Sequence, residues 1–322
     1  MAAGDYFIGH PTCIGWALQA VASGTSWDGT PGTARYMKPV SGNMNIAFGA
    51  DQNFDDTMDV DPASITTGAT KVSGSFQVLL SYEHQELLGI GILCGDDAEA
   101  GAGPYTHTPP LADQLKYLTL YYYYEDFKTV RHLRTVTNAV ITNFTITASA
   151  EARPMLSVSW VGQSQALTTP GADPTLNTAD LVDWDELTAT INGVARCASS
   201  VTFTVDQPVD DSDVGMCSDA PNVNTIFRSG PRTAQLSVEM GLDSTIDAIL
   251  DAPSTALSTN SLAWNNGGAG AAERDITITM TSLYQNQHDT QIATWGKRRE
   301  SLNYSVLGWG IVWTNSLSAA QV

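Results

Sequence analysis

Acidic residues and one histidine are the side chains of this sequence that could carry out catalysis. Asp96-Asp97 and Asp210-Asp211 are adjacent acid pairs, and a glycosidase needs two carboxyl groups facing each other across a cleft. His107 could act as a general base, but no GxSxG turn or activated cysteine supplies a nucleophile for it. We therefore interpret both acid pairs as charged surface loops and His107 as a structural or exposed histidine, and we predict that the protein is not an enzyme.

A second acidic segment superficially resembles a calcium-binding loop. Asp51, Asn53 and Asp55 have the spacing of the first, third and fifth ligands of such a loop. Its sixth position requires glycine and is Asp56 here, and its twelfth position requires a bidentate acid and is Pro62. We predict a solvated acidic loop, and no metal or cofactor.

The charge of the whole chain limits its partners. The 322 residues contain 15 Lys and Arg against 34 Asp and Glu, for a formal net charge of −19. Stable binding to nucleic acids or anionic membranes needs basic patches, so both are disfavoured. An acidic protein could still form a wall past which DNA slides without sticking, and a salt-loving source would also explain the acidity.

Further features of the sequence indicate folding in a cytoplasm. The first ten residues lack the basic and apolar regions of a signal peptide, and the longest apolar run, 87–94, is far below the ~18 residues of a membrane span. The cysteines form no CxxC pair, and we expect reduced, buried thiols. They are Cys13, Cys94, Cys197 and Cys217.

Alternating apolar and polar residues are the main structural pattern and predict a mainly β protein. The segments 141–149 and 156–160 alternate on either side of a turn at 150–154, which predicts a hairpin with an apolar face and a face of short, uncharged polar groups. The apolar face contains Phe144, Ile146, Ala148, Leu156, Val158 and Trp160. The polar face contains Asn143, Thr145, Thr147, Ser149, Ser157 and Ser159.

The order of the remaining elements suggests an internal duplication. Further strands are predicted at Gly42–Phe48, Val72–Tyr82, Leu115–Phe127, Val201–Asp206, Thr233–Met240, Asp275–Leu283 and Leu302–Thr314. Helices are predicted at Glu83–Cys94 and Ser244–Asp251. The order strand, strand, helix, strand, strand therefore occurs twice. The Pro- and Gly-containing segment 168–174 between the halves is typical of a linker.

Four consecutive tyrosines, Tyr121 to Tyr124, raise two alternatives. They could form a stacking platform for a sugar or a base, or a strand covered by protein on both faces. In a strand, Tyr122 and Tyr124 share an apolar row with Leu118 and Leu120. A row this apolar favours a strand between the core and a neighbouring copy of the chain.

The order and spacing of several segments resemble a tail tube protein (major tail protein) of a long-tailed bacteriophage. The resemblance rests on the Gly/Thr-rich segment 22–31, the strand-to-helix unit 71–93, the segment 104–109 and the hairpin 138–162. It implies tandem tube domains of the β-sandwich or barrel type, each with a short helix on its sheet. We expect an N-terminal arm (1–35), a first domain (36–167), a linker (168–184) and a degenerate second domain (185–322).

The resemblance also implies a function and partners. Rings of three duplicated chains, or of six, would stack into a hollow tube in the virion tail, assembled in the host cytoplasm, whose inner sheets form a continuous barrel for passing DNA. Other expected partners are the tape measure, tail terminator and distal tail or baseplate proteins. The polar hairpin face would line the lumen. Contacts between subunits would involve the tyrosines with Lys297, Arg298 and Arg299. The N-terminal arm and an acidic loop with Asp51, Asp55, Asp56 and Asp59 would contact the next ring.

Two other functions remain open at this point. A two-domain β-sandwich of a phage fibre or surface lectin would use the tyrosines to bind a saccharide. A glycosidase on a β scaffold would need an acid pair that no feature of the sequence positions.

Overall fold

The computed structural model describes residues 13–19, 34–53, 64–101, 103–125, 131–170, 174–176, 180–214, 223–241, 256–290 and 299–317. Within these residues the chain is almost entirely antiparallel β, with one α-helix of eight residues and two 3-10 turns. No described helix has the length and apolar character needed to span a membrane.

The elements of the first half are β1 (Cys13–Leu18), β2 (Arg35–Met37), β3 (Ser41–Asn53), β4 (Ser64–Leu79), α1 (Glu86–Leu93), β5 (Tyr105–His107), β6 (Leu118–Glu125), β7 (Arg131–Ser149), β8 (Ala152–Gly162) and β9 (Ser164–Thr168). Those of the second half are η1 (Trp184–Glu186), β10 (Leu187–Ile191), β11 (Val194–Arg196), β12 (Ala198–Asp206), β13 (Val209–Val214), β14 (Val223–Arg228), β15 (Thr233–Gly241), β16 (Leu257–Asn265), η2 (Gly270–Ala272), β17 (Asp275–Thr290) and β18 (Arg299–Asn315).

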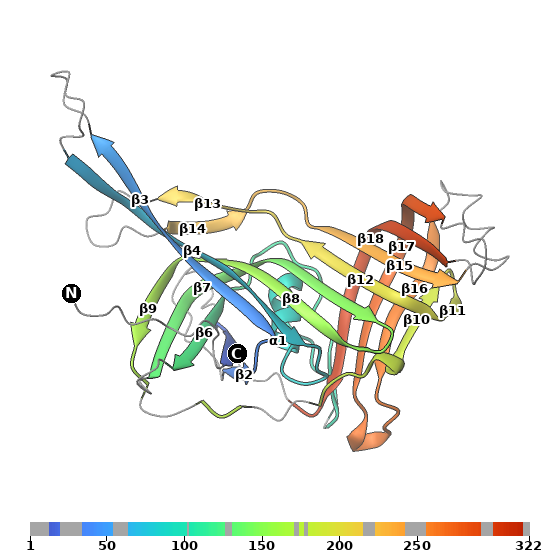
Figure 1. Ribbon diagram of the computed structural model, residues 1–322. Helices are drawn as coiled ribbons and strands as arrows, with labels where there is room; N and C mark the ends of the chain where they lie inside the picture. The colour runs from blue at the N-terminus through green and yellow to red at the C-terminus, as the bar shows by residue number, and fades with distance from the viewer. Residues whose placement is uncertain are drawn as a thin grey trace.

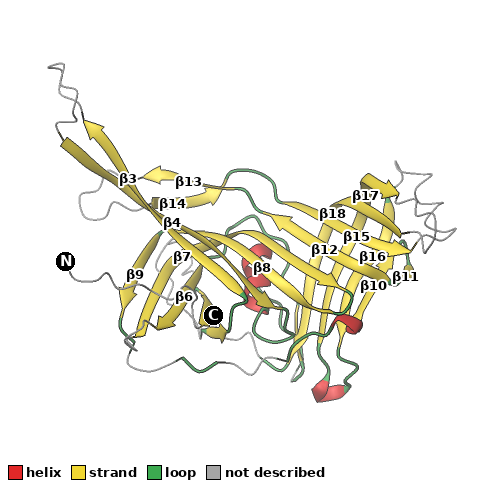
Figure 2. Cartoon of the chain, in the orientation of Figure 1, coloured by secondary structure: helices red, strands yellow, loops and turns green. Residues whose placement is uncertain are grey.

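One large sheet contains strands of both halves (Figure 2). Hydrogen-bonded neighbours follow the path β3, β4, β8, β7, β12, β15, β18, β17, β16, β10 and β11. The long strand β7 also branches, because its N-terminal part pairs with β6, which in turn pairs with β1. The sheet is therefore open, with β3 and β11 at the ends of this path, and a single chain does not form a closed barrel.

The strand order of the first half recurs in the second. In the first half the order across the sheet is β3, β4, β8 and β7, and in the second it is β12, β15, β18 and β17. In each set of four, the two strands that come first in the chain are neighbours. The last two strands follow them across the sheet in the reverse of their chain order. The junction between the halves is the pairing of β7 with β12.

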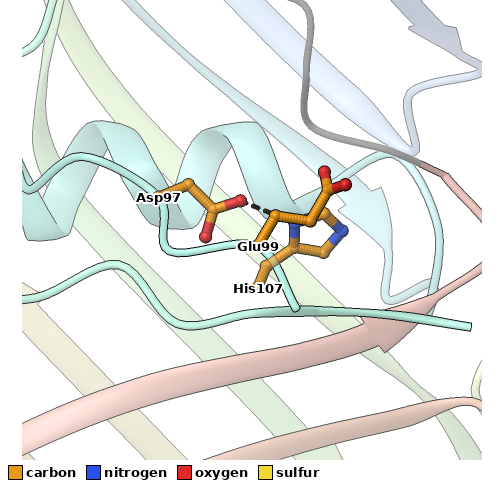
Figure 3. A group of neighbouring side chains, drawn as sticks. All are labelled: Asp97, Glu99 and His107. Carbon is orange, nitrogen blue, oxygen red and sulfur yellow. Dashed lines mark hydrogen bonds and ion pairs between the residues drawn. The ribbon is translucent and has the colours of Figure 1, made fainter. Parts of the chain in front are cut away.

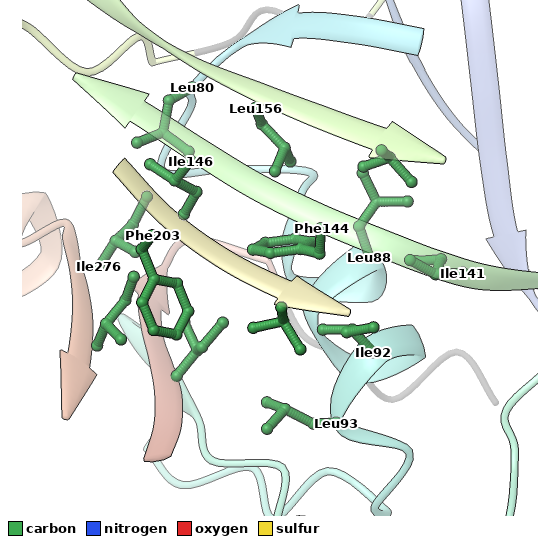
Figure 4. Close-up of a cluster of buried hydrophobic side chains, with 14 of the residues drawn as sticks. Leu80, Leu88, Ile92, Leu93, Ile141, Phe144, Ile146, Leu156, Phe203 and Ile276 are labelled. Carbon is green, nitrogen blue, oxygen red and sulfur yellow. The ribbon is translucent and has the colours of Figure 1, made fainter. Parts of the chain in front are cut away.

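Every strand that the alternating pattern predicts is present, and the faces of the hairpin are as predicted, but nine of the eighteen described strands were not predicted. All seven further strands and the 141–160 hairpin are confirmed, with β4 ending at Leu79 and β6 confined to Leu118–Glu125. Phe144, Ile146 and Phe203 are buried in the core, where Phe144 lies near Leu88 and Ile92 of the helix (Figure 4). The first predicted helix is confirmed as α1, and the second, 244–251, lies outside the described residues.

The helix α1 is buried on all sides, which its sequence Glu-Leu-Leu-Gly-Ile-Gly-Ile-Leu allows. It packs against β1, β7 and β18. A Cβ atom on Gly89 would overlap the indole of Trp313, so glycine permits the close approach of α1 to β18. Gly89 and Gly91 both lie inside the helix, at its packing surface.

An arginine of the second half caps the C-terminal end of this helix. Arg232 Nη1 donates hydrogen bonds to the carbonyl oxygens of Ile92 (2.6 Å) and Leu93 (2.7 Å), and Nη2 donates to the carbonyl of Ala112. The last carbonyls of a helix lack partners within the helix, so a cation there is favourable. The two halves are therefore joined by side chains as well as by the sheet.

Candidate functional site

Asp97, Glu99 and His107 form the only group of potential metal ligands found among the described residues (Figure 3). The fully buried His107 ring has Nδ1 2.7 Å from Asp97 Oδ2, and Nε2 2.9 Å from the Leu317 carbonyl and 3.1 Å from Asn315 Oδ1. The other Asp97 oxygen, Oδ1, accepts a hydrogen bond from the Thr108 amide. The group ties the loop before β5 to the end of β18.

This geometry fits an ion pair better than a metal site. All partners of the two ring nitrogens are acceptors, so a doubly protonated imidazolium satisfies them. A zinc ion between Nδ1 and Oδ2 would hold these atoms about 3.3 Å apart, whereas they are at hydrogen-bonding distance. Burial lowers the pKa of His107, but the hydrogen bond and charge of Asp97, with the charge of Glu86, outweigh burial and raise it.

The acid pairs and histidine thus have structural roles where the structure describes them. His107 is structural, as predicted, but the surface-loop interpretation is wrong for Asp97, whose side chain is only 10% exposed. Asp96 is exposed and pairs with Lys116. Asp211 pairs with Lys71 at 3.1 Å.

The cysteines also depart from prediction at one position. Cys13, Cys94 and Cys197 are free thiols, and Cys197 is exposed rather than buried. Cys217 lies outside the described residues.

The polar face of the large sheet is the most extended chemical feature of the molecule. All six polar residues predicted for the hairpin lie on the face opposite the core. Asn143 pairs with Ser159 and Thr145 with Ser157, whereas Thr147 and Ser149 lie opposite Met155 and Ala152. Thr145 is bonded to Asn143 (3.0 Å) and across the junction to Thr204 (3.2 Å), and Ser157 accepts a hydrogen bond from Gln77 (3.1 Å). These contacts hold short hydroxyl and amide groups in fixed positions.

The same surface continues into the second half of the chain. The alternation of β12, β15 and β18 places on it Thr202, Thr204, Gln235, Ser237, Asn303 and Ser305. Among the side chains that the structure describes, four charged ones share this face near the strand ends, two basic (Lys71, Arg153) and two acidic (Asp206, Glu239). The middle of the described face is therefore uncharged.

Two strand edges at the ends of the repeated strand order have no partner among the described residues. The pairing of β17 with β16 ends at Leu283, so 284–290 pairs with β18 alone. Strand β3 pairs with β4 alone. Large apolar side chains are exposed near both edges, at Tyr284 (41%) and Leu307 (63%) by β17 and at Val40 (51%) by β3. Open edges with exposed apolar groups are typical of surfaces that bind another chain.

Comparison with known protein families agrees with these features. The profile of the phage tail tube protein family matches residues 17–304, which is most of the chain. The chain belongs to the phage tail tube protein family. No curated protein matches it. The family is structural, so this tail tube protein is a component of the virion tail that assembles with further copies of itself.

The tyrosine run of this tail tube protein lies in a strand inside the sheet of one chain, and its contact with a neighbouring copy stays a prediction. Strand β6 is paired on both edges, with β1 and with β7. Tyr122 lies in the core, where its hydroxyl accepts a hydrogen bond from Trp160 Nε1 (2.7 Å), while Tyr123 is buried and Tyr121 and Tyr124 are half-buried. An open aromatic platform for a saccharide is therefore absent from this described strand.

The sequence pattern did not predict β1, which pairs with one edge of β6. Strand β1, Cys-Ile-Gly-Trp-Ala-Leu, is buried at every position, and Trp16 donates a hydrogen bond to the His84 carbonyl (2.7 Å). A short apolar run without alternation was the available signal. Lys297, Arg298, Asp55, Asp56 and Asp59 lie outside the described residues. Asp51 and Arg299 lie in β3 and β18, with side chains not described.

Proposed function

We propose that this protein assembles into rings that stack as the hollow tail tube, with the uncharged polar face lining the channel for DNA. Hydroxyl and amide groups already bonded to one another offer DNA phosphates few free donors. Strong DNA binding requires several Lys and Arg to displace counterions, and the two on this face are offset by two acids. The net charge of −19 repels a polyanion further, so the genome passes without sticking.

We also propose that the chain is a duplicated tube domain, with units at 36–167 and 185–322 joined by a linker at 168–184. The observation that supports this is the repeated strand order across the sheet. Three chains then give six similar domains, a pseudo-six-fold ring. Closure of that ring removes the open edges of each chain.

The pairing of β7 with β12 within one chain is a model for the contact between neighbouring chains. Within the chain, seven residues of β7, Asn143–Ser149, pair with β12. The counterpart of β7 in the second half is β17. Segment 284–290 of β17 is also seven residues long, and one of its edges has no partner among the described residues. The counterpart of β12 in the first half is β3, which is open as well. We infer that β3 of one chain pairs with 284–290 of the next, and that the joint covers Tyr284.

This joint is tested by placing a lysine at the exposed position beside it. Tyr284→Lys is expected to leave the monomer folded by circular dichroism but to reduce assembled protein at least tenfold, because the tyrosine ring would pack on the cross-strand side chains of the next chain's β3 and lysine would lose that contact. Thr279→Lys is the matched control, since Thr279 is exposed on the same strand where β16 already covers the edge. Both are measured by light scattering after size exclusion and by negative-stain microscopy.

The outcomes separate the parts of the proposal. Tubes from Tyr284→Lys like those of the wild type would overturn the β3–β17 joint. Native mass spectrometry of rings is expected to give three chains, and six chains would overturn the duplication-based stoichiometry. A wild-type protein that forms neither rings nor tubes at any concentration would overturn the assembly itself.

A further inference from the structure

Cys94 and Gln207 are buried side by side where the two halves of the chain meet. Cys94 directly follows α1 in the first half, and Gln207 directly follows β12 in the second, 113 residues later in the chain (Figure 1). The two residues are only 2% and 1% exposed. The Cys94 sulfur lies 3.5 Å from Gln207 Oε1. A nucleophile of one half therefore contacts an amide carbonyl of the other.

Arg228, the last residue of β14, contacts both groups through a single nitrogen. Its Nη2 donates a hydrogen bond to Gln207 Oε1 (3.1 Å) and lies 3.8 Å from the Cys94 sulfur. A cation beside a cysteine favours the thiolate, which is the nucleophilic form of the side chain. The same nitrogen donates to the oxygen that would become negative if the carbonyl carbon were attacked, which is the role of an oxyanion hole. Arg228 is thus placed both to activate the sulfur and to polarise the carbonyl.

The surroundings hold the amide in this orientation. Gln207 Nε2 donates to the Ile141 carbonyl (2.9 Å), which keeps Oε1 toward Arg228. A C=O bond is about 1.23 Å long, so the carbonyl carbon lies no more than about 4.7 Å from the sulfur. Rotation about the last side-chain bond of glutamine is soft and shortens this distance. The C-terminal end of a helix disfavours a negative sulfur, but Arg232 already binds the last two carbonyls of α1.

We propose that Cys94 and Gln207 react to form an internal thioester, which joins the two halves of the chain covalently. The structure contains the reactants of this step, a free thiol and an amide. The sulfur attacks Cδ of Gln207 and forms the S–C bond, which gives a tetrahedral oxyanion that Arg228 stabilises. The oxyanion then collapses and the C–N bond breaks. The nitrogen takes the thiol proton and leaves as ammonia.

The fold supplies what this reaction needs. Proximity replaces the encounter of two separate molecules, and no oxidant, reductant or further reactant is required. Both residues are buried, so water has little access to the product and the thioester persists in the folded chain. The bond forms within one chain and does not depend on the assembly of rings.

Intact-mass spectrometry of the urea-denatured wild-type chain tests this reaction. The chain is expected to weigh about 17 Da less than its sequence predicts, because one ammonia is lost. N-ethylmaleimide should label three of the four cysteines, since the sulfur of Cys94 is already bonded. Hydroxylamine, which cleaves thioesters, should restore the fourth labelled thiol. The full sequence mass together with four labelled cysteines would overturn the proposal.

Substitutions distinguish the thioester from any other loss of ammonia. Cys94→Ala and Gln207→Ala are each expected to show the full mass of their sequence. Cys197→Ser is the matched control, because Cys197 is an exposed thiol outside the pair, and it should keep the mass deficit. A deficit that persists in Cys94→Ala would overturn the assignment to this pair.

The role of Arg228 has its own test. Arg228→Gln is expected to lower the fraction of freshly purified chains that carry the deficit at least about tenfold, because the cation and the oxyanion donor are both lost. Arg274→Gln is the matched control, since Arg274 pairs with Glu83 (3.0 Å) away from the thiol. Equal fractions in Arg228→Gln and the wild type would overturn the activation of the pair by Arg228.

Discussion

Gly89 lies where the helix of the first half meets the second half, and its replacement by alanine sets two effects against each other. Alanine is favoured over glycine inside a helix by about 1 kcal/mol. The added Cβ, however, would overlap Cη2 and Cζ3 of Trp313 and lie 3.0 Å from Cζ2. Carbon atoms in contact prefer 3.5 to 4.0 Å, and Trp313 is fully buried, so the indole has no free space to enter.

The clash is expected to dominate. Overpacking a core typically costs about 1–3 kcal/mol, and an overlap with a rigid ring belongs at the upper end of that range. Subtracting about 1 kcal/mol for helix propensity leaves a net destabilisation of about 2 kcal/mol. Gly91→Ala is the matched control in the same helix, because its Cβ meets only the terminal methyl groups of Ile141 and Leu118 at 2.9 Å, which can rotate away.

The assay is urea unfolding of dilute, unassembled protein, followed by circular dichroism. Gly89→Ala is expected to lower the midpoint, while Gly91→Ala stays within about 1 kcal/mol of the wild type. Trp313→Leu in the Gly89→Ala background should recover part of the loss, because a smaller side chain gives the new methyl group room. A Gly89→Ala protein that is as stable as Gly91→Ala would refute the close packing of α1 on β18.

Two further predictions concern polar contacts in the first half. Tyr122→Phe leaves the buried Trp160 indole N–H without its acceptor and is expected to cost about 1–3 kcal/mol in urea unfolding, whereas Tyr121→Phe at a half-buried position should change stability by less than about 0.5 kcal/mol. Equal effects of the two changes would contradict the assigned hydrogen bond. Because the pKa of His107 is raised above 6.5 in the fold, its ion pair with Asp97 contributes fully below pH 6.5, and that contribution is lost as pH rises through the raised value. The melting temperature should therefore fall more in the wild type than in His107→Gln as the pH rises above 6.5, and parallel curves would contradict the imidazolium assignment.

The surroundings of His107 determine the sign of that pH effect. Burial alone would lower its pKa, but Asp97 and Glu86 both face it and favour the charged ring. Glu86 is itself fully buried, and burial raises the pKa of its carboxyl against the influence of Arg35, 3.5 Å away. The ion pair of His107 therefore belongs to a buried group of charges near the start of α1, which a substitution at Glu86 or Arg35 would also alter.

Local periodicity determined the strands and their faces, because successive side chains of a strand point to opposite sides whatever the strand pairs with. Phe144 and Thr145 were assigned to opposite faces from the sequence alone, and the first helix was recognised between two strands. The family, too, could be recognised from the order of these elements.

The strand partners, the ion pair of His107 and the open edges depend on pairing between segments that are far apart in the sequence. Strand β1 pairs with β6 across about a hundred residues of sequence, and this pairing places the tyrosine run inside the sheet of one chain. The ion pair of Asp97 with His107 depends on the end of β18, more than two hundred residues away. The open edges of β3 and β17 likewise arise from which strands pair and where each pairing ends. Side-chain alternation is a property of each strand by itself, whereas partners and edges depend on the packing of the whole chain.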